Sequence, residues 1–289
     1  MATNTRYPTG VHPLLVEETA RRRRIEARFV DAFDGAGFRE VVLPIIDYVE
    51  PYASLAGGAA SKQSYRFVDR EGDLVAIRAD FTPMLARALA PAIAEETLPL
   101  RLFYRGDVIR VEASRLGANR ELFQIGAEII GDDSIDADVA MLRLAAELAS
   151  EPAIVYNDVS IAAVLIAQSS AVREALSAKR MTSGVPAALQ TIVAKLISGE
   201  ATLDDVAPFA PEAAARLSAI GEALAGDDTF VLHLDDIEDI GYYTGLRFRV
   251  YAGPSRAKVA QGGRYDNLYE RFGQRAAAIG FTFTIDDLD

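Results

Sequence analysis

The sequence has no cysteine and no tryptophan, and it has only two histidines, His12 and His233, among its 289 residues. Without a thiol there is no disulfide framework, no cysteine nucleophile and no iron–sulfur cluster, and the zinc sites of zinc fingers and of cysteine-zinc deaminases are excluded as well. A Ser-His-Asp triad would have to use one of the two histidines. No metal site and no cofactor are therefore expected.

Long hydrophobic runs are also lacking. A membrane helix needs about 18 or more apolar residues in succession, and the best candidate, residues 159–167, is far shorter. Residues 1–10 have no apolar region of the kind that a secretory signal carries. We therefore expect a cytoplasmic protein with no membrane partner.

Positive charge is in short supply, because 30 Lys and Arg residues face 42 Asp and Glu residues, for a net charge of −12. Such a balance does not give the positive surface potential that binding to a nucleic-acid phosphate backbone requires. The four arginines at residues 21–24 lie beside Glu17, Glu18 and Glu26, which favours a solvated or partner-facing helix face over a nucleic-acid site. Nucleic acid is not expected as a partner.

Periodicity and turn residues predict the elements of the first half of the chain. Apolar residues at helical spacing indicate a helix over 14–36, which Gly35 and Gly37 end, and a strand over 38–44, which a proline ends. Residues 64–68 and 74–78 read as a hairpin. Thr82 as N-cap and Pro83 at the first helical position predict a helix over 84–94. A second hairpin is expected from 101–110 and 121–131, with a long charged loop between its strands.

The second half begins with a predicted helix over 136–150 and a strand over 153–158. Alanine-rich helical pieces follow over 160–225, and we interpret them as a helical insertion packed on the side of the main sheet. Strands are expected at 230–234, 246–251, 258–261 and 278–284, with a helix that opens at 262–266 and runs to 272. These elements predict an α+β fold in which an antiparallel sheet is flanked by helices.

Four segments place polar groups among apolar strand residues: 78–82, 104–128, 240–245 and 261–266. Each one alone has an ordinary structural explanation, such as a turn or one wet face of a strand. If the sheet brings them together, they form a pocket suited to a small zwitterion whose ammonium faces carboxylates. The predicted pocket residues are Asp80, Thr82, Arg110, Gln124, Glu128, Tyr242 and Tyr243.

Taken in order, these segments resemble the catalytic core of histidyl-tRNA synthetases, which are class II enzymes built on an antiparallel sheet. Residues 38–44 resemble the first, dimer-forming motif. Residues 103–112, Arg120 and the run FQIGAE at 123–128 resemble the second motif, and residues 240–245 and 261–266 resemble the two histidine-specific motifs. The resemblance implies a class II core over residues 1–160 and 228–289, with residues 161–227 as a helical insertion in the same domain.

Three positions depart from the synthetase pattern. Glu238 and Asp287 stand where synthetases carry arginines that serve adenylate formation and hold ATP phosphates, and Ala118 stands where the second-motif loop usually has arginine. Oriented cations are the main source of stabilisation when an α-phosphate is attacked, so two charge reversals in one site would suppress the reaction by many orders of magnitude. Residues 280–288 resemble the third synthetase motif, and the chain ends at Asp289, where a synthetase continues into an anticodon-binding domain. No residue is therefore expected to be catalytic.

One known family shares this pattern, namely the regulatory subunits of ATP phosphoribosyltransferase, which also have aspartate at the position of Asp80. The resemblance implies an inert synthetase paralogue that joins a short-form catalytic subunit in the first step of histidine biosynthesis and confers activation and histidine feedback. It also implies a homodimer within a hetero-oligomer and an amino-acid pocket for L-histidine. Because Glu238 replaces the arginine that would help to hold the histidine carboxylate, the alternatives are that Arg110 substitutes for it, that histidine binds weakly or elsewhere, or that the pocket residues are relics of ancestry kept for packing. Two alternatives stay open: a free-standing aminoacyl-adenylate-forming enzyme, and a histidine-sensing module for another partner.

Overall fold

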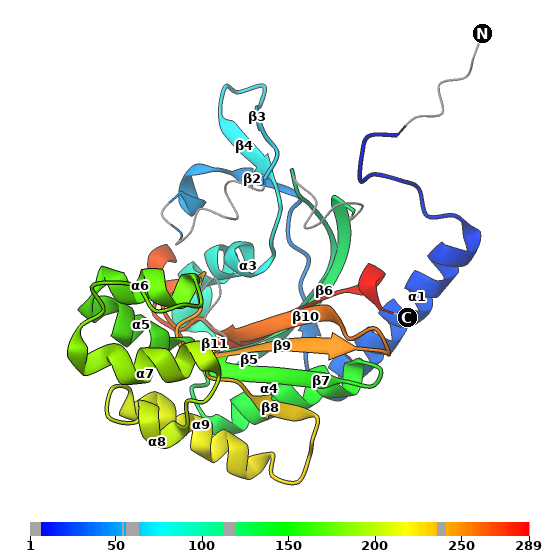
Figure 1. Cartoon of the computed structure of the whole chain (residues 1–289). Helices are drawn as coiled ribbons and strands as arrows, with labels where there is room; N and C mark the ends of the chain where they lie inside the picture. The colour runs from blue at the N-terminus through cyan, green and yellow to red at the C-terminus, as the bar shows by residue number, and fades with distance from the viewer. Residues whose placement is uncertain (1–6, 54, 56–63, 112–118, 236–240, 289) are drawn as a thin grey trace.

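The computed structural model describes residues 7–53, 55, 64–111, 119–235 and 241–288. Within them the chain is built on a sheet of eight strands (Figure 1). In spatial order the strands are β1 (Arg39–Glu40), β5 (Leu100–Ile109), β6 (Glu121–Ile130), β11 (Ala278–Thr284), β10 (Ala257–Arg264), β9 (Leu246–Ala252), β7 (Ala153–Asp158) and β8 (Phe230–Leu232).

The sheet is mixed, with an antiparallel centre. Five of its seven neighbouring pairs are antiparallel, whereas β1 runs parallel to β5 and β8 runs parallel to β7 at the two edges. The predicted hairpin over 101–110 and 121–131 is confirmed as β5 and β6, which pair from Leu100 opposite Ile130 to Ile109 opposite Glu121. The α+β class is confirmed, and the antiparallel description applies to the central strands.

A second sheet of three strands stands apart from the main one at the top of Figure 1. In it β4 (Leu74–Ile77) lies between β2 (Ile46–Tyr48) and β3 (Arg66–Val68) and is antiparallel to both. The hairpin predicted over 64–68 and 74–78 is confirmed as β3 and β4. The turn that joins these strands is closed by Asp69, whose side chain accepts backbone hydrogen bonds from Glu71 and Asp73.

Helices cover both faces of the main sheet (Figure 1). The α-helices are α1 (Val16–Gly35), α3 (Thr82–Leu89), α4 (Ile135–Leu148), α5 (Val159–Gln168), α6 (Ser170–Ser177), α7 (Ala187–Ser198), α8 (Leu203–Val206) and α9 (Pro211–Ala223). Short 3-10 turns are η1 (Glu50–Tyr52), η2 (Ala90–Glu95), η3 (Tyr269–Phe272) and η4 (Ile285–Asp287). No helix among the residues described here is long and apolar enough to cross a membrane.

Alternation along the central strands divides the core into two layers. Phe103 of β5 packs with α1 and α4 in one hydrophobic cluster, whereas its neighbours Leu102 and Tyr104 pack with α3 in another. Successive side chains of a strand point to opposite faces, so the even-numbered residues of β5 and β6 face α3. Gln124 and Glu128 therefore lie on the α3 side of the sheet.

Residues 262–264 continue strand β10, so the helix predicted to open there is wrong. They pair with β11 on one side and with β9 on the other. A Cβ at Gly262 would lie 2.4 Å from the carbonyl oxygen of Gly280, so the two glycines at 262 and 263 allow close approach of neighbouring strands. Only the 3-10 turn η3 follows.

Two further predictions are corrected at helix and strand ends. The strand predicted over 38–44 is only two residues long in the sheet, because Leu43 and Pro44 direct their carbonyl oxygens to the Arg78 side chain instead. Thr82 is not an N-cap: it is the first residue of α3, the N-cap position is Phe81, and the Thr82 hydroxyl is bonded elsewhere.

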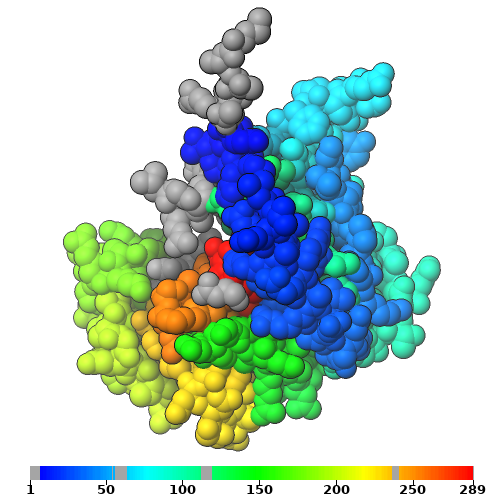
Figure 2. Space-filling view, turned by 90° about the vertical axis from the view of Figure 1, so that its right-hand side faces the viewer, coloured from blue at the N-terminus to red at the C-terminus, as the bar shows by residue number. Residues whose placement is uncertain are grey.

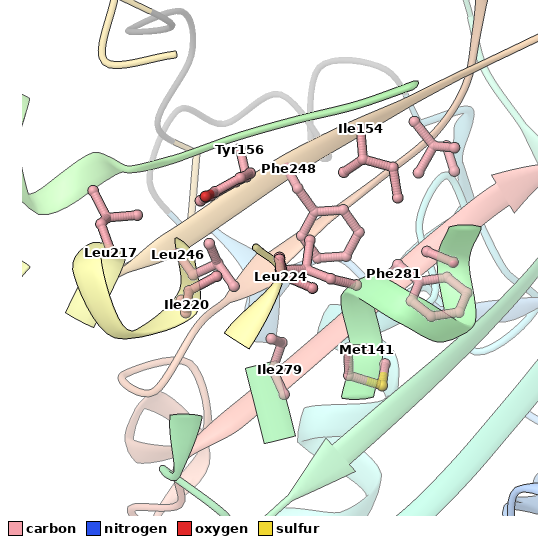
Figure 3. Packing of buried hydrophobic residues seen from close by; sticks show 14 of the residues in the cluster. Met141, Ile154, Tyr156, Leu217, Ile220, Leu224, Leu246, Phe248, Ile279 and Phe281 are labelled. Carbon is pink, nitrogen blue, oxygen red and sulfur yellow. The ribbon is translucent and has the colours of Figure 1, made fainter. Parts of the chain in front are cut away.

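The alanine-rich segment is helical, as predicted, and packs on the α4 side of the sheet. Leu217 and Ile220 of α9 and the following Leu224 meet Tyr156 of β7 and Phe248 of β9 in the same hydrophobic cluster (Figure 3). The segment therefore shares its core with the sheet. The domain boundaries at 160 and 228 stay a prediction.

A buried carboxylate joins α9 to the sheet. Asp138 of α4 has no exposed surface, and its two oxygens bond Nε of Arg264, on β10, and Nε of Arg216, on α9, each at 2.6 Å. Arg264 is itself only 2% exposed and also bonds the carbonyl oxygens of Asp132 and Ser134. The Asp138 carboxylate thus bridges two guanidinium groups from separate layers, and Asp266 is a second ion-pair partner of Arg264, at 3.2 Å.

Asp138→Ala should destabilise the protein by about 3–5 kcal/mol, because it removes the buried carboxylate that pairs with Arg264 and Arg216 and leaves Arg264 only its longer ion pair with Asp266, at 3.2 Å. Urea unfolding followed by circular dichroism measures the change. Asp31→Ala on the exposed side of α1 is the matched control and should leave the free energy of unfolding nearly unchanged. Equal unfolding midpoints for the two variants would contradict this role of Asp138.

Candidate functional site

A pocket of about 530 Å³ lies on the α3 side of the sheet. Its floor is formed by β6, β10 and β11, and its walls come from the start of α3, from Tyr242 and Tyr243, and from the C-terminal turn η4. The lining residues are Asp80, Thr82, Arg110, Asn119, Leu122, Gln124, Tyr242, Tyr243, Ala257, Lys258, Val259, Ala260, Gln261, Tyr265, Gly280, Phe281, Thr282, Thr284, Asp286 and Asp287.

Six of the seven residues predicted from the sequence line this pocket. The seventh, Glu128, is 1% exposed and lies beneath the floor, where it bonds two side chains of the lining, Thr82 and Tyr265. The sheet therefore brings the four polar segments together. That these residues bind a ligand stays a prediction.

Glu128 is held by three hydroxyl donors. Its Oε1 accepts hydrogen bonds from Thr82 Oγ1 at 2.9 Å and from the Tyr104 hydroxyl at 3.0 Å, and its Oε2 accepts one from the Tyr265 hydroxyl. Tyr104 also lies 2.7 Å from the hydroxyl of Thr282 on β11. Residues from α3, β5 and β11 thus meet around one carboxyl group that β6 supplies.

Two glycines on adjacent strands make room for this cluster. A Cβ at Gly280 would lie 1.3 Å from Oε2 of Glu128, and a Cβ at Gly126 would lie 2.6 Å from the Tyr104 hydroxyl oxygen. Real side chains do not tolerate such distances, so any other residue at either position would displace the buried groups. The glycines of β6 and β11 therefore create the space that the buried cluster occupies.

Burial changes the ionisation of the cluster. Desolvation raises the pKa of Glu128 from 4.5 to about 7, with a smaller contribution from the charge of Asp80, even though the bonds from Tyr265, Thr82 and Tyr104 act to lower it. Burial also raises the pKa of Tyr104 and of Tyr265 well above 10. Near neutral pH, Glu128 is the group of the cluster that can exchange a proton.

Asp80 is the carboxylate that lines the pocket at the start of α3. Burial raises its pKa, whereas the charge of Arg110 and hydrogen bonds from the Thr82 and Phe81 amides lower it. The Tyr242 hydroxyl donates to Asp80 Oδ2 at 3.4 Å, and the Tyr242 ring lies 5.1 Å from that of Tyr243. An anionic oxygen and two aromatic faces therefore share one end of the pocket.

Two polar atoms at this end have no hydrogen-bonding partner among the described residues: Oε1 of Gln124 and Nε of Arg110. Both are buried, and each belongs to a residue of the pocket lining. An unsatisfied buried acceptor or donor costs about 1–3 kcal/mol. One acceptor and one cationic donor in the same pocket match the ammonium and carboxylate of a free amino acid.

Sequence reasoning missed Tyr104, Tyr265 and Thr282. Tyr265 lies within the segment 261–266, which was singled out for its polar residues, and Thr282 shares one face of β11 with Gly280 and Thr284 at a spacing of two. That alternation is the signal that could have found Thr282. Arg264 of the same motif points away from the pocket, into the buried network of Asp138.

The C-terminal turn η4 closes the other end of the pocket. Asp286 and Asp287 both line it, and Asp286 bonds Arg22 of α1 at 2.6 Å and the Phe123 amide at 3.0 Å. Figure 2 shows these C-terminal residues, in red, seated against α1, in blue. That Asp287 replaces an arginine that would hold ATP phosphates stays a prediction, and Glu238 and Ala118 lie outside the described residues.

The lining supports binding of a small polar molecule. Its carboxylates are Asp80, Asp286 and Asp287, and its cations are Arg110 and Lys258. No group of three or more His, Asp and Glu side chains could hold a metal ion in the part of the chain that the structure describes. Aromatic faces with a few converging polar groups are typical of small-ligand sites.

Comparison with known proteins gives one consistent family. The protein-family model described as histidyl-tRNA synthetase matches residues 10–288. An ATP phosphoribosyltransferase regulatory subunit of Symbiobacterium thermophilum is 33% identical over 99% of this chain and 79% of its own length. Another protein of the same name, from Anaeromyxobacter dehalogenans, is 32% identical over 96% of this chain and 89% of its own length.

Solved structures agree on the fold. A Bacillus halodurans protein titled ATP phosphoribosyltransferase regulatory subunit/histidyl-tRNA synthetase superposes with a TM-score of 0.85 at 22% identity, over 99% of this chain and 82% of that one. Apo histidyl-tRNA synthetase of S. aureus superposes with a TM-score of 0.71 at 18% identity, over 97% and 72%. The chain therefore belongs to the family defined by the histidyl-tRNA synthetase model and, within it, to the ATP phosphoribosyltransferase regulatory subunits.

Proposed function

We propose that the chain is a non-catalytic regulatory subunit in the cytoplasm. It assembles with a short-form ATP phosphoribosyltransferase catalytic subunit, is required for that subunit's activity, and carries histidine feedback to the first step of L-histidine biosynthesis. The observation that carries this proposal is the pocket: it has the groups for an amino acid at one end and carboxylates at the other. The names of its full-length relatives supply the partner.

L-histidine fits the Asp80 end of the pocket by charge and shape. Its ammonium would face Asp80 and the free Oε1 of Gln124, and its carboxylate would face the Nε of Arg110, which has no partner among the described residues. Its imidazole would lie against Tyr242 and Tyr243, whose rings are 5.1 Å apart and tilted by 40°. Each unpaired atom would gain a charged partner.

The opposite end is unsuited to a triphosphate. Asp287 lines it, and Asp286 holds Arg22 in an ion pair, so that this guanidinium is already neutralised. Two like charges ~4 Å apart repel by about 4 kcal/mol at an effective dielectric of 20. A pocket that binds the amino acid and repels the phosphates would sense histidine without activating it.

Self-association is the third part of the proposal. An apolar row, here named the first-motif row, is exposed on the segment that follows β1: Val42 (88%), Ile45 (58%), Ile46 (50%) and Tyr48 (47%). Contiguous exposed apolar side chains mark interaction surfaces. A second copy of the chain could bury this row through a two-fold interface, because the same residues would meet on both sides.

The purified chain should form a complex with the short-form catalytic subunit from the same organism and raise its rate of phosphoribosyl transfer to ATP. Size-exclusion chromatography and a steady-state assay, each with and without the chain, measure the two effects. L-histidine should inhibit the complex and leave the isolated catalytic subunit less affected. Histidine-dependent exchange of pyrophosphate into ATP by the chain alone would instead support an adenylate-forming enzyme.

Asp80→Asn should weaken binding of L-histidine about ten- to a hundredfold, because it removes a charged hydrogen-bond acceptor that faces the ammonium. Isothermal titration calorimetry with the isolated chain and with the complex measures the affinity. Asp31→Asn, at an exposed aspartate of α1 outside the pocket lining, is the control and should bind like the unmodified chain. An unmodified chain that takes up no histidine in either setting rules out the pocket.

Histidine binding should release a proton near neutral pH. Glu128, with a pKa of about 7, is half protonated at pH 7, and a cationic group bound above it favours its charged form. This contribution strengthens binding as the pH rises through 7. Titration in buffers of different ionisation enthalpy should count about half a proton more for the unmodified chain than for Glu128→Gln. Identical proton counts would show that Glu128 does not sense the ligand.

A further inference from the structure

Arg78 holds three consecutive carbonyl groups of the segment that carries the first-motif row. Its Nη1 donates to the carbonyl oxygens of Leu43 at 2.9 Å and Pro44 at 3.4 Å, and its backbone amide donates to that of Ile45 at 2.9 Å. The segment leaves the main sheet after β1, so these bonds take the place of backbone hydrogen bonds to a neighbouring strand of that sheet. Arg78 thereby fixes the backbone at residues 43–45, which includes Ile45 of the row, whereas Ile46 and Tyr48 lie in β2 and pair with β4.

The same guanidinium also contacts β5 and an aromatic stack that leads to the Glu128 cluster. Nε of Arg78 donates to the Asp107 carbonyl oxygen of β5 at 2.7 Å, and the guanidinium carbon lies 4.2 Å from the ring centre of Phe81. Phe81 stacks on Tyr104 with ring centres 4.5 Å apart and an angle of 10°. Tyr104 donates to Glu128. Two stacked planes thus separate Arg78 from the buried carboxyl group.

Gly106 leaves the space that this arrangement needs. A Cβ there would lie 2.5 Å from Nη2 of Arg78, and the residue has a φ of +147°. Arg78 is 9% exposed, so its charge is satisfied by backbone carbonyls and by the Phe81 face within the protein. A planar fork with several donors suits these partners, whereas lysine offers a single point charge.

We infer that Arg78 is a positioning residue that fastens the first-motif row to the floor of the ligand pocket, so that self-association and ligand binding are thermodynamically linked. The inference rests on the proposed function for both the ligand and the self-association. Asp80 and Thr82 flank Phe81 in the chain, so the position of the Phe81 ring also sets the position of two lining groups. Linkage is reciprocal: a dimer that orders the row should bind ligand more tightly, and ligand should tighten the dimer.

The variant pair that isolates this role is Arg78→Lys and Arg101→Lys. Arg101 also donates to a carbonyl oxygen, that of Ala36, and also lies over a phenylalanine, Phe38, at 5.8 Å, but it does so away from the pocket. Both substitutions keep the charge. Phe81→Leu is the second variant, since it keeps Arg78 and removes the stack; it serves if Arg78→Lys does not fold.

The first measurement needs no ligand. Carbon-13 NMR of the labelled carboxyl group follows the titration of Glu128. Because the Tyr104 hydrogen bond lowers the pKa of Glu128, its loosening in Arg78→Lys or Phe81→Leu should raise that pKa, and Arg101→Lys should leave it unchanged. A Glu128 titration that is the same in all four proteins overturns the positioning role, whatever the ligand proves to be.

The second measurement tests the link by sedimentation equilibrium with and without saturating L-histidine. Histidine should lower the dimer dissociation constant of the unmodified chain and of Arg101→Lys about tenfold, and that of Arg78→Lys less than twofold. A dimer constant that histidine leaves unmoved or raises overturns the inference, as does a chain that binds histidine as a monomer only. Absence of histidine binding in calorimetry is a different result, because it contradicts the proposed function itself.

Discussion

The pocket depends on a single constraint, which is the burial of the Glu128 carboxyl group under the face of a central strand. A carboxyl group out of contact with water needs donors around it, and here they are hydroxyl groups from three other elements. Burial raises the pKa of this carboxyl group to about 7, because the hydrogen bonds from the hydroxyl donors offset the desolvation only in part. Several features accommodate this group and its partners. They are the glycines of β6 and β11, the position of α3 and the stack of Tyr104 on Phe81.

How much of this could be predicted depends on whether the cause is local. Gln124 and Glu128 were predicted on one face because alternation along a strand is a local rule, and the hairpins were predicted because turn residues mark them. The 38–44 strand was overextended, since its carbonyls bond to Arg78, 34 or 35 residues away in the chain. Tyr265 bonds Glu128, 137 residues away in the chain, and no local pattern specifies that contact, whereas the alternation along β11 could have indicated Thr282.

The same distinction applies to charge. Composition predicted an acidic protein that avoids nucleic acid, and the motif comparison singled out Asp287, which the structure places in the pocket lining. Neither composition nor the motifs predicted that Asp286 pairs with Arg22 or that Asp138 pairs with two arginines. Ion pairs between distant elements require knowledge of packing, and they decide whether an arginine in the sequence is available to a ligand. Arg264 lies in a motif that resembles a ligand site, yet it serves the core.

Together, the two ends of the pocket favour binding of a ligand without catalysis. An enzyme gains rate only from contacts that are stronger in the transition state than in the ground state, and for adenylate formation those contacts are cations around the phosphates. At the Asp80 end the chain has groups that fit a ground-state amino acid, and at the other end it has carboxylates. In such a site the binding free energy stabilises the bound amino acid and does not stabilise a transition state. A regulatory subunit requires that ligand binding change another surface of the molecule. Here that surface is the first-motif row, and Arg78 contacts both the segment of this row and the aromatic stack next to the pocket.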